Sequence, residues 1–198
     1  MPVDKEKEKA IESQCRALIK ARKFDEAARA MEKYRAPLHD WLGDYDLHLN
    51  GEVKDISIMY NIIPDQLQGI NFEYLQTIRE ELAYMWLRGN NTIRKFMKKP
   101  TNIPGLTIGI GMKIMLNRAC QLRNISDWKQ LRFCSGVEIL NAPDLCPECK
   151  KICGRYSFAD NIPPLPNPKC MKADPCLPLM VSIIPAAEPP KKKRFGLF

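Results

Sequence analysis

The chain has 198 residues, and 31 Lys and Arg against 23 Asp and Glu give it a formal net charge of +8 at pH 7. Hydrophobic residues make up 45% and charged residues 27%, which excludes a wholly disordered chain, a collagen-like repeat and a coiled-coil rod. The positive charge favours polyanionic partners without naming one.

Residues 1–37 predict a helical hairpin. Apolar residues over 10–19 recur with the spacing of one face of an amphipathic helix. Residues 21–24 are expected to turn, and Asp25 to cap a second helix that Pro37 ends. A single unit of this kind, with no repeat after it, is typical of a packing or docking hairpin.

Residues 38–135 predict a helical core that contains a small β-hairpin. Apolar and polar residues alternate between positions 44 and 60 around Asn50-Gly51, a dipeptide typical of two-residue hairpin turns. Residues 72–86 have the apolar spacing of a long helix. The other expected elements are a short basic helix over 93–99, a loop over 101–111, a helix over 113–123 and a last helical turn over 127–132 that Ser126 caps.

Three glycines in the 101–111 loop raise the question of a phosphate-binding loop. These are Gly105, Gly109 and Gly111. Neither a Gly-Lys-Ser/Thr sequence nor a Gly-x-Gly-x-x-Gly pattern accompanies them, so we interpret the segment as a flexible connector.

The chain is expected to be a soluble protein of the cytoplasm. Its first residues lack the apolar core of a secretory signal, and no segment reaches the ~18 uninterrupted apolar residues of a membrane-spanning helix. We therefore expect no membrane partner. A reducing cytosol keeps thiols free, so a local cluster of cysteines predicts a metal before it predicts disulfides.

Residues 136–182 carry such a cluster. Five of the eight cysteines lie in this segment, after a strand predicted over 137–140 and around a short strand predicted over 155–158: Cys146, Cys149, Cys153, Cys170 and Cys176. Cys146-Pro147-Glu148-Cys149 is a C-x-x-C pair that can direct two thiolates at one tetrahedral Zn²⁺.

Cys170 and Cys176 form a second pair that would close the shell of a structural zinc site. Their spacing is looser than usual, and Cys153 is a competing ligand, so the spacing leaves open which four of the five bind metal. Zinc would supply folding energy to a proline-rich segment that is poor in large apolar residues.

The order of these motifs resembles the C-terminal module of phage head morphogenesis proteins, the Mu-F-like minor head family. The resemblance covers about residues 112–182, and its motifs are the predicted strand, Cys-Pro-Glu-Cys at 146–149, Gly154-Arg155-Tyr156, Pro-Leu-Pro at 164–166 and Pro168-Lys169-Cys170. It implies a non-enzymatic role in head assembly, with phage head or portal proteins as partners and a place in the host cytoplasm and the virion.

Residues 183–198 predict an extended tail. Prolines are followed by a basic run and an apolar end, a pattern that is typical of a docking peptide and equally of a disordered chain end. Candidate contacts to a partner or to nucleic acid are Lys150, Lys151 and Arg155 in the cysteine module and Lys191, Lys192, Lys193, Arg194, Phe195, Leu197 and Phe198 in the tail.

An enzyme is not expected. The chain has two histidines, His39 and His48, and neither stands in a nucleophile motif. A hydrolase would require a cleft that holds one of them beside Asp or Cys. No small-molecule substrate is expected either.

The fold class we predict is mainly α with a small β-hairpin and a C-terminal zinc-knuckle-like module. The predicted function is that of a phage-derived structural or adaptor protein, in which a structural Zn²⁺ supports protein–protein assembly. The alternative is a zinc-dependent nucleic-acid-binding protein, because basic side chains near a zinc knuckle can contact phosphates.

Overall fold

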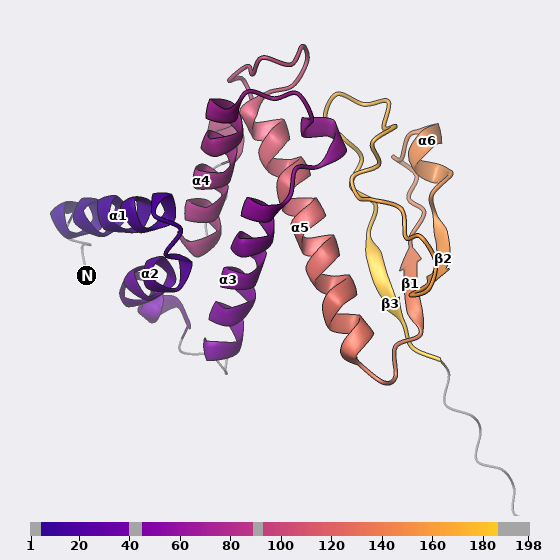
Figure 1. Cartoon of the computed structure of the whole chain (residues 1–198), viewed down its shortest axis with the longest axis horizontal. Helices are drawn as coiled ribbons and strands as arrows, with labels where there is room; N and C mark the ends of the chain where they lie inside the picture. The colour runs from indigo at the N-terminus through magenta and orange to yellow at the C-terminus, as the bar shows by residue number, and fades with distance from the viewer. Residues whose placement is uncertain (1–4, 40–44, 89–92, 186–198) are drawn as a thin grey trace, which may run out of the picture.

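A computed structural model describes residues 5–39, 45–88 and 93–185 (Figure 1). The helices in these ranges are α1 (Lys5–Lys20), α2 (Phe24–His39), α3 (Tyr45–Asn61), α4 (Phe72–Arg88), α5 (Ile108–Gln130) and α6 (Pro147–Lys150). Two 3-10 turns, η1 (Asp65–Leu67) and η2 (Ile93–Phe96), and three strands, β1 (Gly136–Ile139), β2 (Gly154–Ser157) and β3 (Met180–Ile183), complete them. The predicted fold class is confirmed: the chain is mainly helical, with a small antiparallel sheet and a C-terminal cluster of four cysteines.

The molecule has a helical body on one side and a small sheet on the other. Helix α5 runs between them: it contacts α3 and α4 on the body side and β1 on the sheet side (Figure 1). Helices α1 and α2 pack against each other at the far end of the body. None of the helices in the described ranges is both long and apolar enough to cross a lipid bilayer.

Two groups of buried apolar side chains hold the helical body together. One lies between α3, α4 and α5 and includes Ile78, Leu82 and Met115. The other joins the hairpin of α1 and α2 to α3 and α4 through residues such as Ile19 and Ile56. Each fully buried side chain of this size contributes roughly 1.5–3 kcal/mol, so this burial stabilises the body without the cysteine segment.

The β-hairpin predicted between residues 44 and 60 is wrong, because α3 occupies this segment. Ile56 and Tyr60 are one helical turn apart and both are buried against the α1–α2 hairpin. Met59 is buried in the other group, against α4 and α5. Burial on two sides of a helix outweighs the local preference of Asn50-Gly51 for a turn.

A buried arginine joins the end of α3 to α4. Arg79 is 7% exposed, and it donates from Nε to the carbonyl of Met59 at 3.1 Å and from Nη2 to the carbonyl of Ile62 at 2.8 Å. These carbonyls lie at the C-terminal end of α3, where a helix leaves acceptors unpaired and carries partial negative charge. Arg79 is therefore the side-chain cap of α3. An ion pair joins α3 to α5, with 2.8 Å between the buried carboxylate of Asp55 and the half-buried guanidinium of Arg123.

Helix α5 starts earlier and runs further than expected. The side chain of Thr107 accepts a hydrogen bond from the Ile110 amide at 3.2 Å, so α5 begins at Ile108, inside the predicted loop. It continues without a break to Gln130, so the expected break at Ser126 is wrong. Similarly, α2 continues through Pro37 to His39.

Two of the three glycines of the predicted loop serve close packing in α5. A Cβ at Gly109 would lie 2.8 Å from the backbone nitrogen of Met97, and one at Gly111 would lie 2.5 Å from Cδ1 of Ile78. Their missing side chains let α5 approach η2 and α4. Gly105 lies before α5 and has a φ of +77°, a conformation that favours glycine. It is the one glycine of the three that lies in a loop, as predicted.

The sheet has the strand order β2-β1-β3, and both pairs are antiparallel (Figure 1). Val137 in the central strand lies opposite Tyr156 of β2 and Ser182 of β3. The strands predicted over 137–140 and 155–158 are confirmed within one residue, whereas β3 was not expected. The cysteine-bearing loops lie between these strands.

Candidate metal centre

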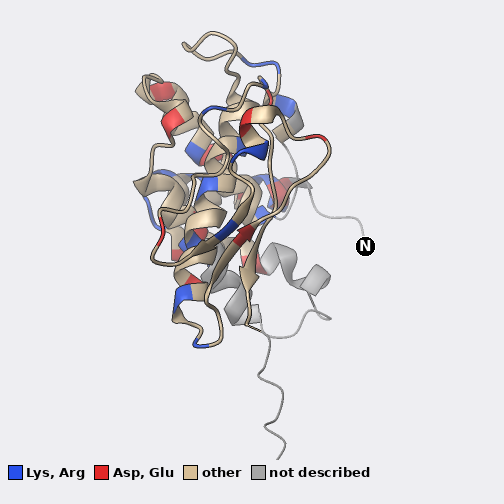
Figure 2. Ribbon diagram, turned by 90° about the vertical axis from the view of Figure 1, so that its right-hand side faces the viewer, with Lys and Arg blue, Asp and Glu red and all other residues tan. Residues whose placement is uncertain are grey.

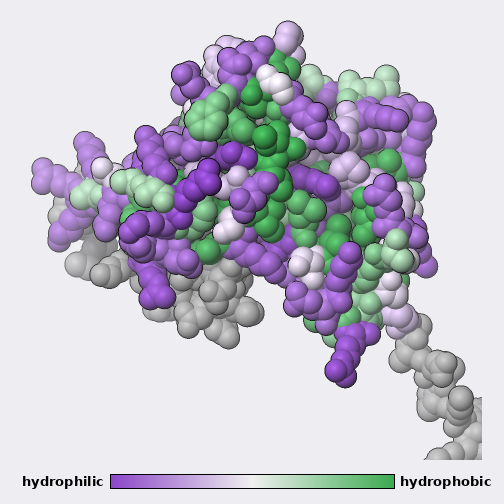
Figure 3. All heavy atoms as spheres, viewed as in Figure 1, coloured by the Kyte–Doolittle hydropathy of each residue, from purple (hydrophilic) through white to green (hydrophobic). Residues whose placement is uncertain are grey.

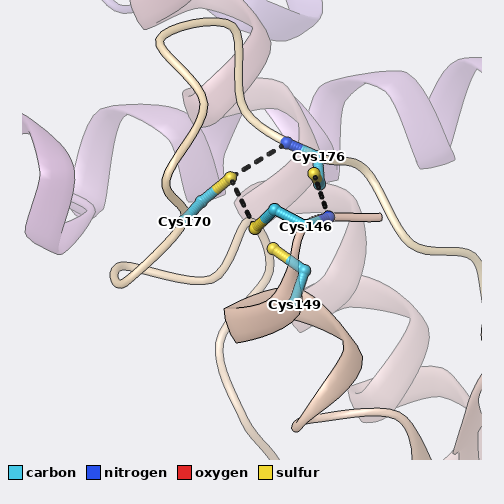
Figure 4. Close-up of side chains that lie close together, drawn as sticks. All are labelled: Cys146, Cys149, Cys170 and Cys176. Atoms are coloured by element: carbon cyan, nitrogen blue, oxygen red, sulfur yellow. Dashed lines mark hydrogen bonds between the residues drawn. The ribbon is translucent and has the colours of Figure 1, made fainter. Parts of the chain in front are cut away.

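The structure brings four of the five clustered cysteines to one point: Cys146, Cys149, Cys170 and Cys176. Their Sγ atoms all lie within 4.8 Å of one another and point toward a common centre (Figure 4). Four sulfurs at ~2.3 Å from a tetrahedral Zn²⁺ are ~3.8 Å apart, and the Sγ atoms of Cys146 and Cys170 are 3.8 Å apart. The donor set and its spacing therefore fit a structural zinc ion.

The first pair of cysteines is presented by the short helix α6. Cys146 precedes the helix, and Pro147 occupies its first turn, where a proline costs no hydrogen bond. The Lys150 amide donates to the carbonyl of Cys146 at 3.0 Å and closes the turn. Cys146 and Cys149 are three residues apart, so their side chains leave the same face.

The second pair comes from the loop before β3, and Asn167 attaches this loop to α6. Asn167 is 5% exposed, and its Nδ2 donates to the carbonyl of Glu148 at 2.8 Å. Its own carbonyl accepts from the Cys170 amide at 2.9 Å, and its Oδ1 accepts from the Lys169 amide at 3.0 Å. Sequence reasoning missed Asn167, and the only local signal is its place between Pro166 and Pro168.

Backbone amides also point at the sulfurs. The Cys146 amide donates to Sγ of Cys176, and the Cys176 amide donates to Sγ of Cys170, each at 3.3 Å (Figure 4). Four thiolates around Zn²⁺ carry a net charge of −2, and amide donors stabilise that charge.

The thiols of the site differ in their pKa values. A hydrogen bond from the backbone of Met171 lowers the pKa of Cys146 to about 6. Burial raises the pKa values of Cys149 and Cys176 above the usual range of a thiol. A thiol with this pKa is mostly a thiolate at neutral pH, so Cys146 can bind metal without losing a proton. Cys149 and Cys176 must each lose a proton when metal binds.

Cys153, the competing ligand, lies outside the group of four. Its Sγ donates to the carbonyls of Cys149, at 3.4 Å, and Leu140, at 3.6 Å. Burial raises its pKa. The three remaining cysteines lie in other parts of the chain: Cys15 in the α1–α2 core, Cys120 in α5 and Cys134 before β1.

The basic residues predicted to contact a partner have different surroundings. Lys150, Lys151 and Arg155 are exposed. Lys151 pairs with Glu148 at 2.5 Å, and Arg155 pairs with Glu138 across the sheet at 3.3 Å. The seven residues predicted in the tail, between 191 and 198, lie outside the described residues, as do the side chains of His39 and His48.

Comparison with models of protein families, with curated proteins and with solved structures finds no significant match in any of the three. The resemblance to phage head morphogenesis proteins therefore stays a prediction that depends on the sequence motifs of about residues 112–182.

Proposed function

We propose that the chain is a non-enzymatic structural or adaptor protein whose C-terminal module, built around a structural zinc ion, presents a surface to protein partners. The observation that carries the proposal is the set of four Sγ atoms within 4.8 Å of one another. A tetrahedral zinc ion held by four thiolates has no position left for water or substrate, so its role is structural.

The module has little else to stabilise it. Its buried apolar side chains are few: Leu145 and three of the four clustered cysteines form one group, and Val137, Ile139 and Leu165 are the other larger ones. Such a small apolar core cannot offset the entropy of ordering its long loops. A zinc ion that joins α6 to the loop before β3 would supply that free energy and make the loop surface rigid.

The end of the module and the residues directly after it are rich in exposed apolar side chains. Of the eight large apolar side chains that are exposed in the described residues, four lie between residues 171 and 184: Met171, Leu177, Leu179 and Ile184. Figure 3 shows apolar surface over β3 on this face of the molecule. Surfaces of this kind beside a rigid centre are typical of protein–protein contacts.

The resemblance to phage head morphogenesis proteins indicates the class of partner. It favours phage head or portal proteins and a place in the assembling virion. The test is whether the purified chain co-elutes with head and portal proteins encoded by the same genome. We expect co-elution with the wild-type chain, its loss with Cys149→Ser, and its retention with the control Cys153→Ser.

Metal analysis of the same samples separates the two parts of the proposal. We expect about one zinc per chain in the wild type and in Cys153→Ser, and almost none in Cys149→Ser. Zinc with no co-elution would reject the assembly role, and a fully folded chain with no metal would reject the structural zinc.

A zinc-dependent nucleic-acid-binding protein is the second candidate, favoured by exposed lysines around the site. Lys150, Lys169 and Lys172 are exposed and form no ion pair among the described residues, and Lys172 donates to the backbone carbonyl of Asp144 at 2.6 Å. Against it, Figure 2 shows acidic residues interspersed with basic ones on the side that carries the sheet. Binding to a DNA duplex that weakens steeply with salt would support this function over the first.

A further inference from the structure

A pocket of about 310 Å³ lies where the helical body meets the cysteine module. Three segments that are distant in the sequence form it: the turn that leads into η1, the middle of α5 and the proline-rich loop before Cys170. Its apolar walls include Ile62, Ile63, Leu122 and Pro164. Its volume is at the lower end of the range for small-molecule sites, ~300–1,000 Å³.

One cation, Arg118, lines this pocket and has no ion-pair partner among the described residues. The side chain is half-buried, and burial lowers its pKa even though Asp65 acts in the opposite direction. The Asp65 carboxylate does not form an ion pair with Arg118, and a partly dehydrated guanidinium without an ion pair is costly to keep in an apolar wall.

The other half-buried or buried arginines of the described body have their partners. Three of them form ion pairs: Arg16 with Glu81, Arg88 with Glu8 and Arg123 with Asp55. The fourth, Arg79, donates to two carbonyls at the end of α3. Arg118 differs from all of them, since its one hydrogen bond goes to the neutral amide of Gln121.

That hydrogen bond fixes the guanidinium in place. Gln121 is 3% exposed, and its Oε1 accepts from Arg118 Nη1 and from the Leu165 amide, the latter at 2.8 Å. Its Nε2 donates to the carbonyl of Pro163 at 2.7 Å. Gln121 thus holds one edge of the guanidinium against the proline-rich loop, and the remaining N–H groups stay available to a ligand.

We propose that this pocket binds a free apolar α-amino acid. The carboxylate would pair with Arg118, whose planar fork matches two carboxylate oxygens. The ammonium would face Asp65, an exposed carboxylate in the same lining, and the apolar side chain would contact the isoleucine and proline walls. Asp65 also disfavours phosphate, because a second negative charge on the ligand would be repelled.

The test is titration of the ¹⁵N-labelled full chain, loaded with zinc, with four probes followed by amide chemical shifts. We expect leucine to shift amides of residues 62–66, 118–122 and 163–165. Isoamylamine, which lacks the carboxylate, should not shift them, and 4-methylpentanoate, which lacks the ammonium, should bind more weakly than leucine. Absence of any leucine-dependent shift in these residues, or stronger binding of inorganic phosphate, would overturn the proposal.

Variants locate the binding determinants. Arg118→Gln should weaken leucine binding about tenfold or more, in line with the loss of a charged hydrogen-bonded pair. Asp65→Asn should remove the preference for leucine over 4-methylpentanoate. The matched control Arg132→Gln, at an exposed arginine beyond the end of α5, should bind as the wild type does.

A further variant covers the case in which Arg118→Gln does not fold. Ile63 is 52% exposed and lines the pocket, so Ile63→Asp should fold normally while it places a negative charge beside the ligand carboxylate. We expect Ile63→Asp to lose leucine binding. Leucine affinity equal to that of the wild type in this variant would contradict the proposal.

Discussion

Asn167 connects the two pairs of cysteines through its own hydrogen bonds. Its side chain reaches α6, and its backbone accepts from Cys170. In Asn167→Ala the carbonyl of Glu148 loses its donor, and the loop that carries Cys170 loses its attachment to α6. We expect zinc affinity to fall about tenfold or more, as for other residues that orient metal ligands. Competition with a chromophoric chelator would measure it.

The matched control is Asn161→Ala, at an exposed asparagine of the preceding loop. It should leave zinc affinity unchanged. Equal affinities of Asn167→Ala and the wild type would show that the second pair of cysteines holds its position without this amide.

The unequal thiols predict how metal binding depends on pH. Above about pH 6, Cys146 is already a thiolate, so zinc displaces protons mainly from thiols such as Cys149, whose pKa is raised. Below about pH 6, the proton on Cys146 must be displaced as well. Zinc affinity should therefore fall as the pH falls, with about one more proton released per zinc below this pH.

Calorimetry in buffers of different ionisation enthalpy would count the released protons. A proton count that stays constant from pH 5 to pH 8 would contradict the lowered pKa of Cys146. Cys153→Ser serves as the control, since Cys153 lies outside the group of four and should not alter the count.

Helix α5 packs tightly enough at its first turn to require glycine. Gly109 faces the backbone of Met97, whose nitrogen would lie 2.8 Å from a new Cβ. Gly109→Ala should destabilise the chain by about 1–3 kcal/mol despite the better helix propensity of alanine. Denaturant unfolding would measure the change. Met97→Ala in the same chain should not restore stability, because it removes the contact with the sulfur but not those with the backbone nitrogen and Cα of Met97.

Gly111→Ala provides the contrast. Its closest contact is Cδ1 of Ile78, the end of a side chain, at 2.5 Å. The second substitution Ile78→Val removes that atom and should therefore recover stability in this case. Recovery at Gly109 but not at Gly111 would be the reverse of what the packing predicts.

The end of α3 depends on Arg79 of the neighbouring helix. Arg79→Met keeps much of the apolar stem but leaves the carbonyls of Met59 and Ile62 without their donor. We expect a loss of about 2 kcal/mol or more in the free energy of unfolding. Arg29→Met, at an exposed arginine, is the control and should change stability little. A similar loss in both variants would argue against capping.

The molecule as a whole should respond to metal removal in one part only. The helical body has two groups of buried apolar side chains that do not involve the clustered cysteines, whereas the buried group around the metal site consists of Leu145 and cysteines. Chelation should therefore remove amide hydrogen-exchange protection from α6 and β3 while α4 and the first half of α5 keep theirs. Loss of protection throughout the chain would show that zinc supports the body too.

The cysteine site was predictable because its first pair lies within one helical turn. The C-x-x-C spacing alone places Cys146 and Cys149 on one face. The local cluster of cysteines around them predicts a metal site. No local pattern predicts that Cys149 and Cys170 meet. Which four of the five cysteines form the site depends on the course of the loop before Cys170, and Asn167 fixes that course through its hydrogen bonds. The predicted division into four segments and the role of the tail stay predictions.

The predictions from local sequence pattern were wrong where burial in the folded chain outweighed local preference. Asn50-Gly51 is a strong turn signal, yet Ile56, Met59 and Tyr60 gain more from burial on a helix between two groups of apolar side chains. The glycines of α5 predicted a loop because their packing partners, Met97 and Ile78, lie in other segments of the chain.

By themselves, the residues of this chain determined a mainly helical body, a short strand before the cysteines and a first C-x-x-C pair, because these features depend on neighbours a few positions apart. Only the tertiary structure decided the helix at α3, the third strand, the set of four sulfurs and the pocket around Arg118. Each of these depends on contacts between distant segments, and burial, which outweighs local preference, is a property of the assembled fold.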